Sequence, residues 1–295
     1  MIVKENSEMV SVHFDSMIDL MDFVPENPNN RDVFNEYINP RYDRYGNSKW
    51  LGGNTHKQIV EKALLGDTAV YKESMKRMKV LEADGEIKEK SQSVKKAKRI
   101  KCKSDMGDEL DIHKVYQGNL SHAWSKTKRI EIDVKHHLVT LFITINGNCD
   151  IEFRDTIWRS AMILKLANEI QQAGKSVKIV VGGCVGSAML NTNKLLTVSI
   201  TVKKYNETLS PERLAAMTNI GFYRTFGFAA KECQNRTVHS SGGASTTIYK
   251  NTMPIHLHEE IEMGHTKPIF LSGVTSEYAA KSELGRAYRQ MSQIA

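Results

Sequence analysis

The sequence of 295 residues contains no long apolar run, and this absence limits the class of protein. No segment approaches the roughly 20 consecutive apolar residues that a membrane-spanning helix needs. The N-terminal residues MIVKENSEMV also lack the basic start and apolar core of a secretory signal peptide. We therefore expect a cytoplasmic protein that makes no contact with a membrane.

Cysteine is scarce, and the motifs of nucleotide and metal chemistry are absent. The four cysteines are far apart and form no C-x-x-C pair, which argues against a disulfide framework and a thiolate zinc site. The sequence contains neither the G-x-x-x-x-G-K-[ST] phosphate loop nor a G-x-G-x-x-G before a helix. It also lacks the G-x-S-x-G and H-E-x-x-H motifs. We therefore expect no cofactor and a protein that is not an enzyme.

Acidic residues are rare in one segment, where most of the net charge of +7 lies. Residues 86–103 contain eight Lys or Arg against two acidic residues, and the remainder of the chain is close to neutral. Such a cluster either contacts the phosphates of a nucleic acid or is a solvated surface. The residues that we predict to contact nucleic acid are Lys88, Lys95, Lys96, Lys98, Arg99, Lys101, Lys103, Lys128 and Arg129.

Residues 138–181 predict a βαβ unit around which the chain is organised. Residues 139–145 form an apolar run that is typical of a strand buried on both faces. From Asp155 apolar residues recur at helical spacing, and Gly174 follows as a stop signal. A second apolar run occupies residues 177–182. We predict two adjacent parallel strands joined by one helix with a right-handed crossover.

The N-terminal part of the chain predicts a small helical region over residues 1–85. Residues 1–50 are polar and are interrupted by Pro25, Pro28 and Pro40, so we expect a segment that is weakly structured or wraps another surface. Apolar residues at helical spacing predict helices over residues 55–65 and 68–83, which would pack as an αα-hairpin. Residues 86–127 would follow as a basic linker and connecting segment.

Residues 128–295 carry the remaining elements of an α/β domain. Ile130, Ile132 and Val134 alternate with charged residues, which predicts a half-exposed edge strand. Further strands are predicted over residues 195–202, 253–257 and 269–271. Helices are predicted to begin at Pro211, after a capping Ser210, and to cover residues 276–294. The predicted fold class is a mostly parallel, Rossmann-type sheet flanked by helices.

The arrangement of residues 128–295 resembles the von Willebrand factor A family. In that family the first buried strand ends in D-x-S-x-S, whose carboxylate and hydroxyl groups hold a divalent cation. The matching residues are Thr144-Ile145-Asn146-Gly147-Asn148. The resemblance therefore implies an A-type fold that lacks the carboxylate ligand. The W-x-G-G-N element at residues 50–54 is also similar to that of uncharacterised phage-encoded proteins, which implies the host cytoplasm as the location.

Loops at the carboxyl ends of parallel strands are where open α/β sheets place ligands. The residues that we predict to form a partner-binding loop there are Asn146, Asn148, Asp150 and Gly183. An alternative is a cation site rebuilt from Asp150, Glu152 and Asp155. The simpler interpretation is that the asparagines form a turn and that Asp155 is an N-terminal helix charge. We predict no metal at this position.

A second pair of candidate metal ligands is His256 and His258. On a strand their imidazoles would point to one face, at a spacing that suits zinc or nickel. The simpler interpretation is a solvated strand end, because the spacing fixes no third ligand.

Two functions from different classes are compatible with these features. The first is a non-enzymatic binding module, of phage or mobile-element origin, that presents a degenerate A-type domain to a protein partner. The second is a single-stranded DNA- or RNA-binding protein that uses the basic segment at residues 88–103. Binding to nucleic acid separates the two hypotheses.

Overall fold

The computed structural model describes residues 1–25, 28–38, 49–82, 99–104, 109–118, 123–129, 138–147, 150–185, 195–232, 245–246, 253–262 and 267–292. The chain divides into two compact units. The larger unit combines Met1–Lys88 with His137–Ala295, and the smaller unit is the insertion Glu89–His136. The N-terminal residues, which the sequence assigns to a region of their own, therefore lie in the same unit as residues 137–295.

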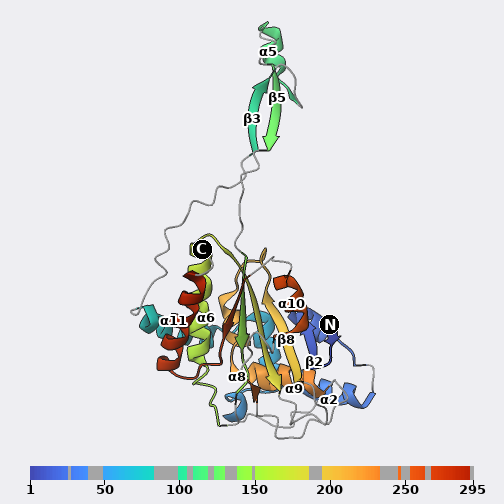
Figure 1. The fold of residues 1–295 in the computed structure, drawn as a ribbon, viewed down its shortest axis with the longest axis vertical. Coiled ribbons are helices and arrows are strands. Elements are labelled where there is room, and N and C mark those ends of the chain that lie inside the picture. The colour runs from blue at the N-terminus through green and yellow to red at the C-terminus, as the bar shows by residue number, and fades with distance from the viewer. Residues whose placement is uncertain are drawn as a thin grey trace. The chain divides into compact units, whose positions relative to one another are not determined.

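The predicted βαβ arrangement forms the centre of the larger unit (Figure 1). Strand β6 (Leu138–Thr144) pairs in parallel with β7 (Ser176–Val185), and helix α6 (Ile157–Gln172) connects them. Leu141 and Phe142 point to opposite faces of the sheet and are both fully buried. The adjacent parallel strands are confirmed, and the handedness of their crossover stays a prediction. Strand β10 (Lys267–Leu271) extends the parallel part on the other side of β6.

The complete sheet is mixed, so the expectation of a mostly parallel sheet is wrong. Its order is β1-β2-β8-β7-β6-β10, and the short strand β9 (Ser245–Thr246) also pairs with β7. Strand β8 (Leu195–Lys203) runs antiparallel to β7. The chain between these two strands is only nine residues long, whereas a parallel connection needs about a dozen or more. The chain therefore returns in the opposite direction.

The N-terminal segment supplies two strands, so the expectation of weak structure is wrong for residues 2–14, and residues 39–48 of this segment lie outside the described residues. Strand β2 (Met9–Phe14) pairs in parallel with β8, and β1 (Ile2–Glu5) pairs antiparallel with β2. All six residues of β2 are buried. Its polar residues are stabilised by β8, since His13 bonds Ser199 of that strand. The polar residues of β2 are therefore the reason why the sequence did not predict this buried strand.

One face of the sheet carries the main apolar core, which helices cover. Buried residues of α6, α7 (Pro211–Met217) and α11 (Glu277–Ser292) belong to this core. Helices α3 (His56–Leu65) and α4 (Thr68–Glu82) add apolar residues to it. Thr55 caps α3 in a capping box with Gln58. Both α3 and α4 pack against α7 and do not form the expected αα-hairpin.

The remaining elements of this unit are short. They are α1 (Met17–Met21), α2 (Pro28–Ile38), η1 (Lys49–Leu51), α8 (Ile220–Phe222), the π-helix η4 (Tyr223–Gly227), α9 (Phe228–Glu232) and α10 (Ile255–Glu262). Strands β8 and β10 and helices α7 and α11 confirm the elements predicted near residues 195–202, 269–271, 211 and 276–294. In the described ranges, no helix has both the length and the apolar composition needed to cross a membrane.

Helix α10 occupies the position of the strand predicted at residues 253–257, so that prediction is wrong. Met253 and Leu257 are buried with Phe142 and Val180 in a second, smaller apolar cluster on the other face of the sheet. Leu257 and the partly buried Ile261 are one helical turn apart on α10, and both contact this cluster. The apolar residues therefore follow helical spacing, whereas the alternation of histidines suggested a strand.

The smaller unit contains a three-stranded antiparallel sheet in the order β3-β5-β4. Strand β3 (Arg99–Ser104) pairs with β5 (Trp124–Arg129), which also pairs with β4 (Glu109–Leu110). Helix α5 (Ile112–Tyr116) follows β4. The described part of the basic segment is therefore a strand and not the expected linker. The edge strand predicted at residues 130–134 lies outside the described residues.

Candidate nucleic-acid interface and strand-end residues

Two basic runs that are separated in the sequence meet on one β-ladder of the smaller unit. Arg99 lies directly opposite Arg129, and Ile100 lies opposite Lys128. This pairing places β3 residues of the predicted basic segment beside the run at residues 126–129. The predicted nucleic-acid contacts that the ladder brings together are Arg99, Lys101, Lys103, Lys128 and Arg129. The other four, Lys88, Lys95, Lys96 and Lys98, lie outside the part of the chain that the structure describes.

Strand alternation sorts the ladder positions into two sides. Directly opposed residues share a side, as do residues two apart on one strand. Arg99, Lys101, Lys103 and Arg129 therefore occupy one side of this ladder, which Glu109 of β4 shares because it lies opposite Ser125. We call these four residues the basic strip. Lys126 and Lys128 occupy positions on the opposite side.

A short helix in the same unit exposes apolar side chains. Tyr116 of α5 is 86 % exposed, and Ile112 and Leu110 are also exposed. Ile112 and Tyr116 are four residues apart and therefore lie on the same side of α5. The backbone N–H of Asp111 donates to Ala123 O at 2.7 Å, which fastens the start of α5 beside β5. The unit thus combines a basic ladder with an exposed aromatic ring.

Two of the four strand-end residues that the sequence predicts as a partner-binding loop are buried. Asn146 is buried, and Gly183 lies beside it, since a Cβ on Gly183 would be 3.2 Å from Asn146 Cβ. The expectation that Gly183 is a loop residue is wrong because β7 continues to Val185 and Gly183 pairs with Val198 of β8. Asp150 is exposed, and Asn148 is not among the described residues.

Arg159 of α6 fastens this edge of the sheet. Its side chain is fully buried, and its guanidinium donates to Ile145 O at 2.7 Å, Asn146 O at 3.3 Å and Thr218 O at 3.4 Å. Burial lowers the pKa of Arg159 to about 9. The Arg159 guanidinium donates hydrogen bonds to backbone carbonyl groups just after β6 and α7. The edge is therefore a packed junction and not an open ligand loop.

The strand that would point the candidate metal ligands His256 and His258 to one face is absent, because both residues lie on α10. Residues two apart on a helix point about 200° apart and cannot share a ligand on one side. His256 is buried and stacks on His13 of β2, with ring centroids 3.8 Å apart and planes inclined by 30°. Across the described ranges, no three His, Cys, Asp or Glu side chains are grouped so that they could hold a metal ion.

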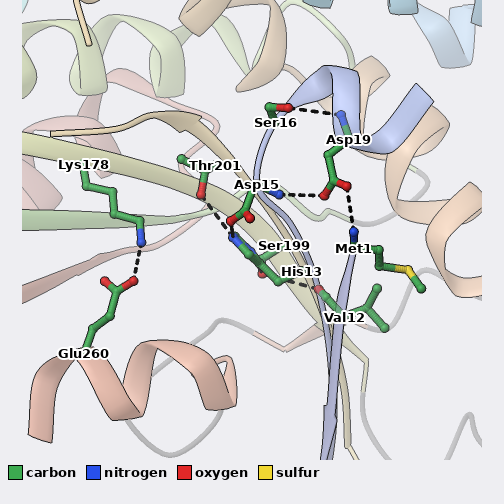
Figure 2. Close-up of polar contacts among 10 residues, drawn as sticks. All are labelled: Met1, Val12, His13, Asp15, Ser16, Asp19, Lys178, Ser199, Thr201 and Glu260. Atoms are coloured by element: carbon green, nitrogen blue, oxygen red, sulfur yellow. Dashed lines mark hydrogen bonds and ion pairs between the residues drawn. The ribbon is translucent and has the colours of Figure 1, made fainter. Parts of the chain in front are cut away.

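His13 is the centre of a polar network that no sequence motif marks (Figure 2). Its Nδ1 is 2.9 Å from Ser199 Oγ, and its Nε2 is 3.1 Å from Thr201 Oγ1 and 3.5 Å from the Asp15 carboxylate. Burial is the largest cause that lowers the pKa of His13 to about 2 and that of His256 to about 3. Both imidazoles are therefore neutral at pH 7. Because 186 residues separate His13 and Ser199, only the fold brings the network together.

Comparison with known proteins gives a family but no described relative. No curated protein and no solved structure matches the chain. The model of the family described as domain of unknown function DUF7192 matches residues 3–294. This match includes the basic ladder, the strand-end edge and the histidine network. The chain therefore belongs to the DUF7192 family.

Proposed function

We propose that the smaller unit binds single-stranded nucleic acid and that the basic strip contacts its phosphates. The observation that carries the proposal is the register of β3 and β5, which gathers cations from two separate runs on one side of a ladder. The unit contains 12 Lys or Arg against 7 Asp or Glu, a net charge of +5 in 48 residues. The other 247 residues carry a net charge of only +2.

The opposition of Arg99 and Arg129 is better explained by binding than by folding. Like charges at directly opposed positions destabilise a β-ladder, by about 0.2–1 kcal/mol on the scale of cross-strand pairs. A phosphate replaces this repulsion by attraction, and guanidinium groups bind phosphate oxygens through paired hydrogen bonds. Positions two apart on β3 are about 6.7 Å apart, so cations recur regularly along the strip.

The preference for a single strand is supported by Tyr116. Its ring is 86 % exposed, and it lies in the same compact unit as the strip. Unpaired bases stack on exposed aromatic rings, whereas the bases of a duplex stack on one another and are not available. Phosphate contacts position the strand without reading it, so we expect little sequence preference.

A gel-shift series with single- and double-stranded DNA and RNA tests this proposal. The test variant combines Lys101→Glu with Arg129→Glu, two positions of the basic strip. The control combines Lys57→Glu with Lys72→Glu, which makes the same charge change on exposed positions of α3 and α4. We expect wild type and control to retard single strands, and the test variant to bind at least about tenfold more weakly. Failure of wild type to retard any strand at low salt would contradict the proposal.

A protein partner at the strand-end edge has less support, because Asn146 and Gly183 are buried. Exposed Asp150 is the described residue that favours this second function. The von Willebrand A relationship also stays a proposal. It is supported by the β6–α6–β7 unit with β10 beside β6, and the antiparallel position of β8 departs from a mostly parallel sheet.

A further inference from the structure

The larger unit contains a cavity that takes no part in the nucleic-acid proposal. Its volume is about 500 Å³, and it lies at the edge of the sheet where β2 and β8 end and β6 and β7 begin. This edge is opposite to the one at which the sequence predicts a ligand. The polar side chains that line it include Lys178, Thr201, Lys204, Tyr205, Asn206 and Glu260.

The described walls of the cavity leave one cation available to a ligand. The ammonium of Lys178 is 2.6 Å from the Glu260 carboxylate, so these two charges compensate each other (Figure 2). Lys204 is exposed at the rim, and the described residues provide no ion-pair partner for its ammonium group. Asn206 is exposed beside it and carries an amide that can donate hydrogen bonds.

The buried residues behind the cavity also favour negative charge. Thr201, which lines the cavity, bonds His13, and His13 stacks on His256. Neither ring nitrogen of His256 has a hydrogen-bond partner among the described residues, and a buried polar atom without a partner is costly. After burial, the charges of Lys4, Lys178 and Lys204 lower the pKa of one or both imidazoles, and the Asp15 carboxylate, 3.5 Å from His13 Nε2, is the anion beside them.

The wall of the cavity also carries an acceptor. Asp15 lines this cavity and a neighbouring one of about 300 Å³, and its side chain is 57 % exposed. A carboxylate at this place repels a ligand that is anionic throughout, but it accepts a hydrogen bond from a hydroxyl group. Lys204 and Asp15 therefore specify different ends of one ligand.

We propose that this cavity binds a small organic anion whose carboxylate or phosphate group lies at Lys204 and Asn206. A hydroxyl group of the same ligand donates to Asp15. The volume of about 500 Å³ is within the usual range of small-molecule sites. The paired charges of Lys178 and Glu260 close one side of the site, because they join α10 to β7.

Calorimetry on the full chain tests the proposal with four probes: glycerate, glycerol 3-phosphate, inorganic phosphate and glycerol. We expect one of the two organic anions to bind, and the tighter one identifies the anionic group. Glycerol lacks the charge and inorganic phosphate lacks the hydroxyl-bearing carbons, so both should bind at least about tenfold more weakly.

Variants separate the site from a general charge effect. Lys204→Gln should weaken binding of the preferred anion by about tenfold or more, whereas Lys72→Gln on α4 should leave it unchanged. Both residues are exposed, so neither change should disturb the fold. Binding should also move the imidazole nitrogen resonances of His13, which is bonded to Thr201. The proposal is overturned if neither organic anion binds more tightly than about 10 mM, or if Lys204→Gln binds as well as wild type.

Discussion

The imidazole rings of His13 and His256 stack with their centroids 3.8 Å apart, and this contact joins α10 to β2. Both rings are buried, and burial keeps their native pKa values at about 2 and about 3, far below the ordinary 6.5. The native state therefore binds fewer protons than the unfolded state below pH 6.5. The stability that the two neutral imidazoles contribute is therefore fully present above pH 6.5 and is lost as the pH falls.

The first prediction is the size of this decrease. Each histidine lowers the free energy of unfolding by up to about 1.4 kcal/mol per pH unit below 6.5, so the pair accounts for about 4 kcal/mol between pH 7.5 and pH 5. Urea unfolding at pH 7.5, 6 and 5 measures it. His256→Phe keeps an aromatic ring and removes one titration, so it should remove about half of the dependence on pH. Exposed His113→Gln is the control, and an equal effect of both changes would contradict the prediction.

The second prediction concerns Gly52 in the W-x-G-G-N element. Gly52 has a φ of 67°, and a Cβ at this position would lie 2.2 Å from Phe153 Cγ. Gly52→Ala should therefore lower the free energy of unfolding by about 3 kcal/mol, from left-handed strain of about 1–2 and overpacking of about 1–3. In a Phe153→Ala background the ring clash is gone, but the strain and the 2.8 Å contact with Phe153 Cβ persist, so the loss should be smaller by about 1 kcal/mol or more. Urea unfolding of the four proteins measures this coupling, and strict additivity would show that the clash is relieved elsewhere.

The third prediction concerns divalent cations at the end of β6. Thr144 is the residue that the proposed A-type resemblance matches to the carboxylate ligand, and Arg159 donates to the backbone carbonyl of the buried Asn146. Mg²⁺ is usually held by one or two carboxylates, so calorimetry should detect no binding tighter than about millimolar. Tighter binding that Asn148→Ala abolishes would revive the cation site.

Much of the α/β unit could be predicted from the sequence because its elements carry their own signals. The apolar runs of β6 and β7 are buried on both faces, and Thr55 begins α3 as a capping residue. Strand β2 was missed because its polar Ser11 and His13 are buried against polar partners 186 or more residues away in β8 and in α10. No local pattern contains such a partner.

The candidate nucleic-acid interface could be predicted only in part. Counting charges identified the basic residues. Lysines are uncommon in strands, so the sequence did not predict that β3 pairs with β5. Arg99 lies opposite Arg129 because of the register in which β3 and β5 pair. That register is set by turn geometry and by residues far apart in the sequence. The cavity at Lys204 was not predicted because its lining comes from β6, β7, β8 and α10 and from the residues that follow β2 and β8.

The salt dependence of single-strand binding tests the central claim most directly. Each phosphate that a cation neutralises on a single strand contributes about 0.7 to the log-log slope of affinity against salt, so the four cations of the basic strip predict a slope of about 3. Lys101→Glu with Arg129→Glu should lower the slope by at least about 1.4 and weaken binding to all sequences alike. Lys57→Glu with Lys72→Glu should leave it unchanged. A wild-type affinity that does not vary with salt, or the same slope in the strip variant, would contradict a phosphate-binding role for the ladder.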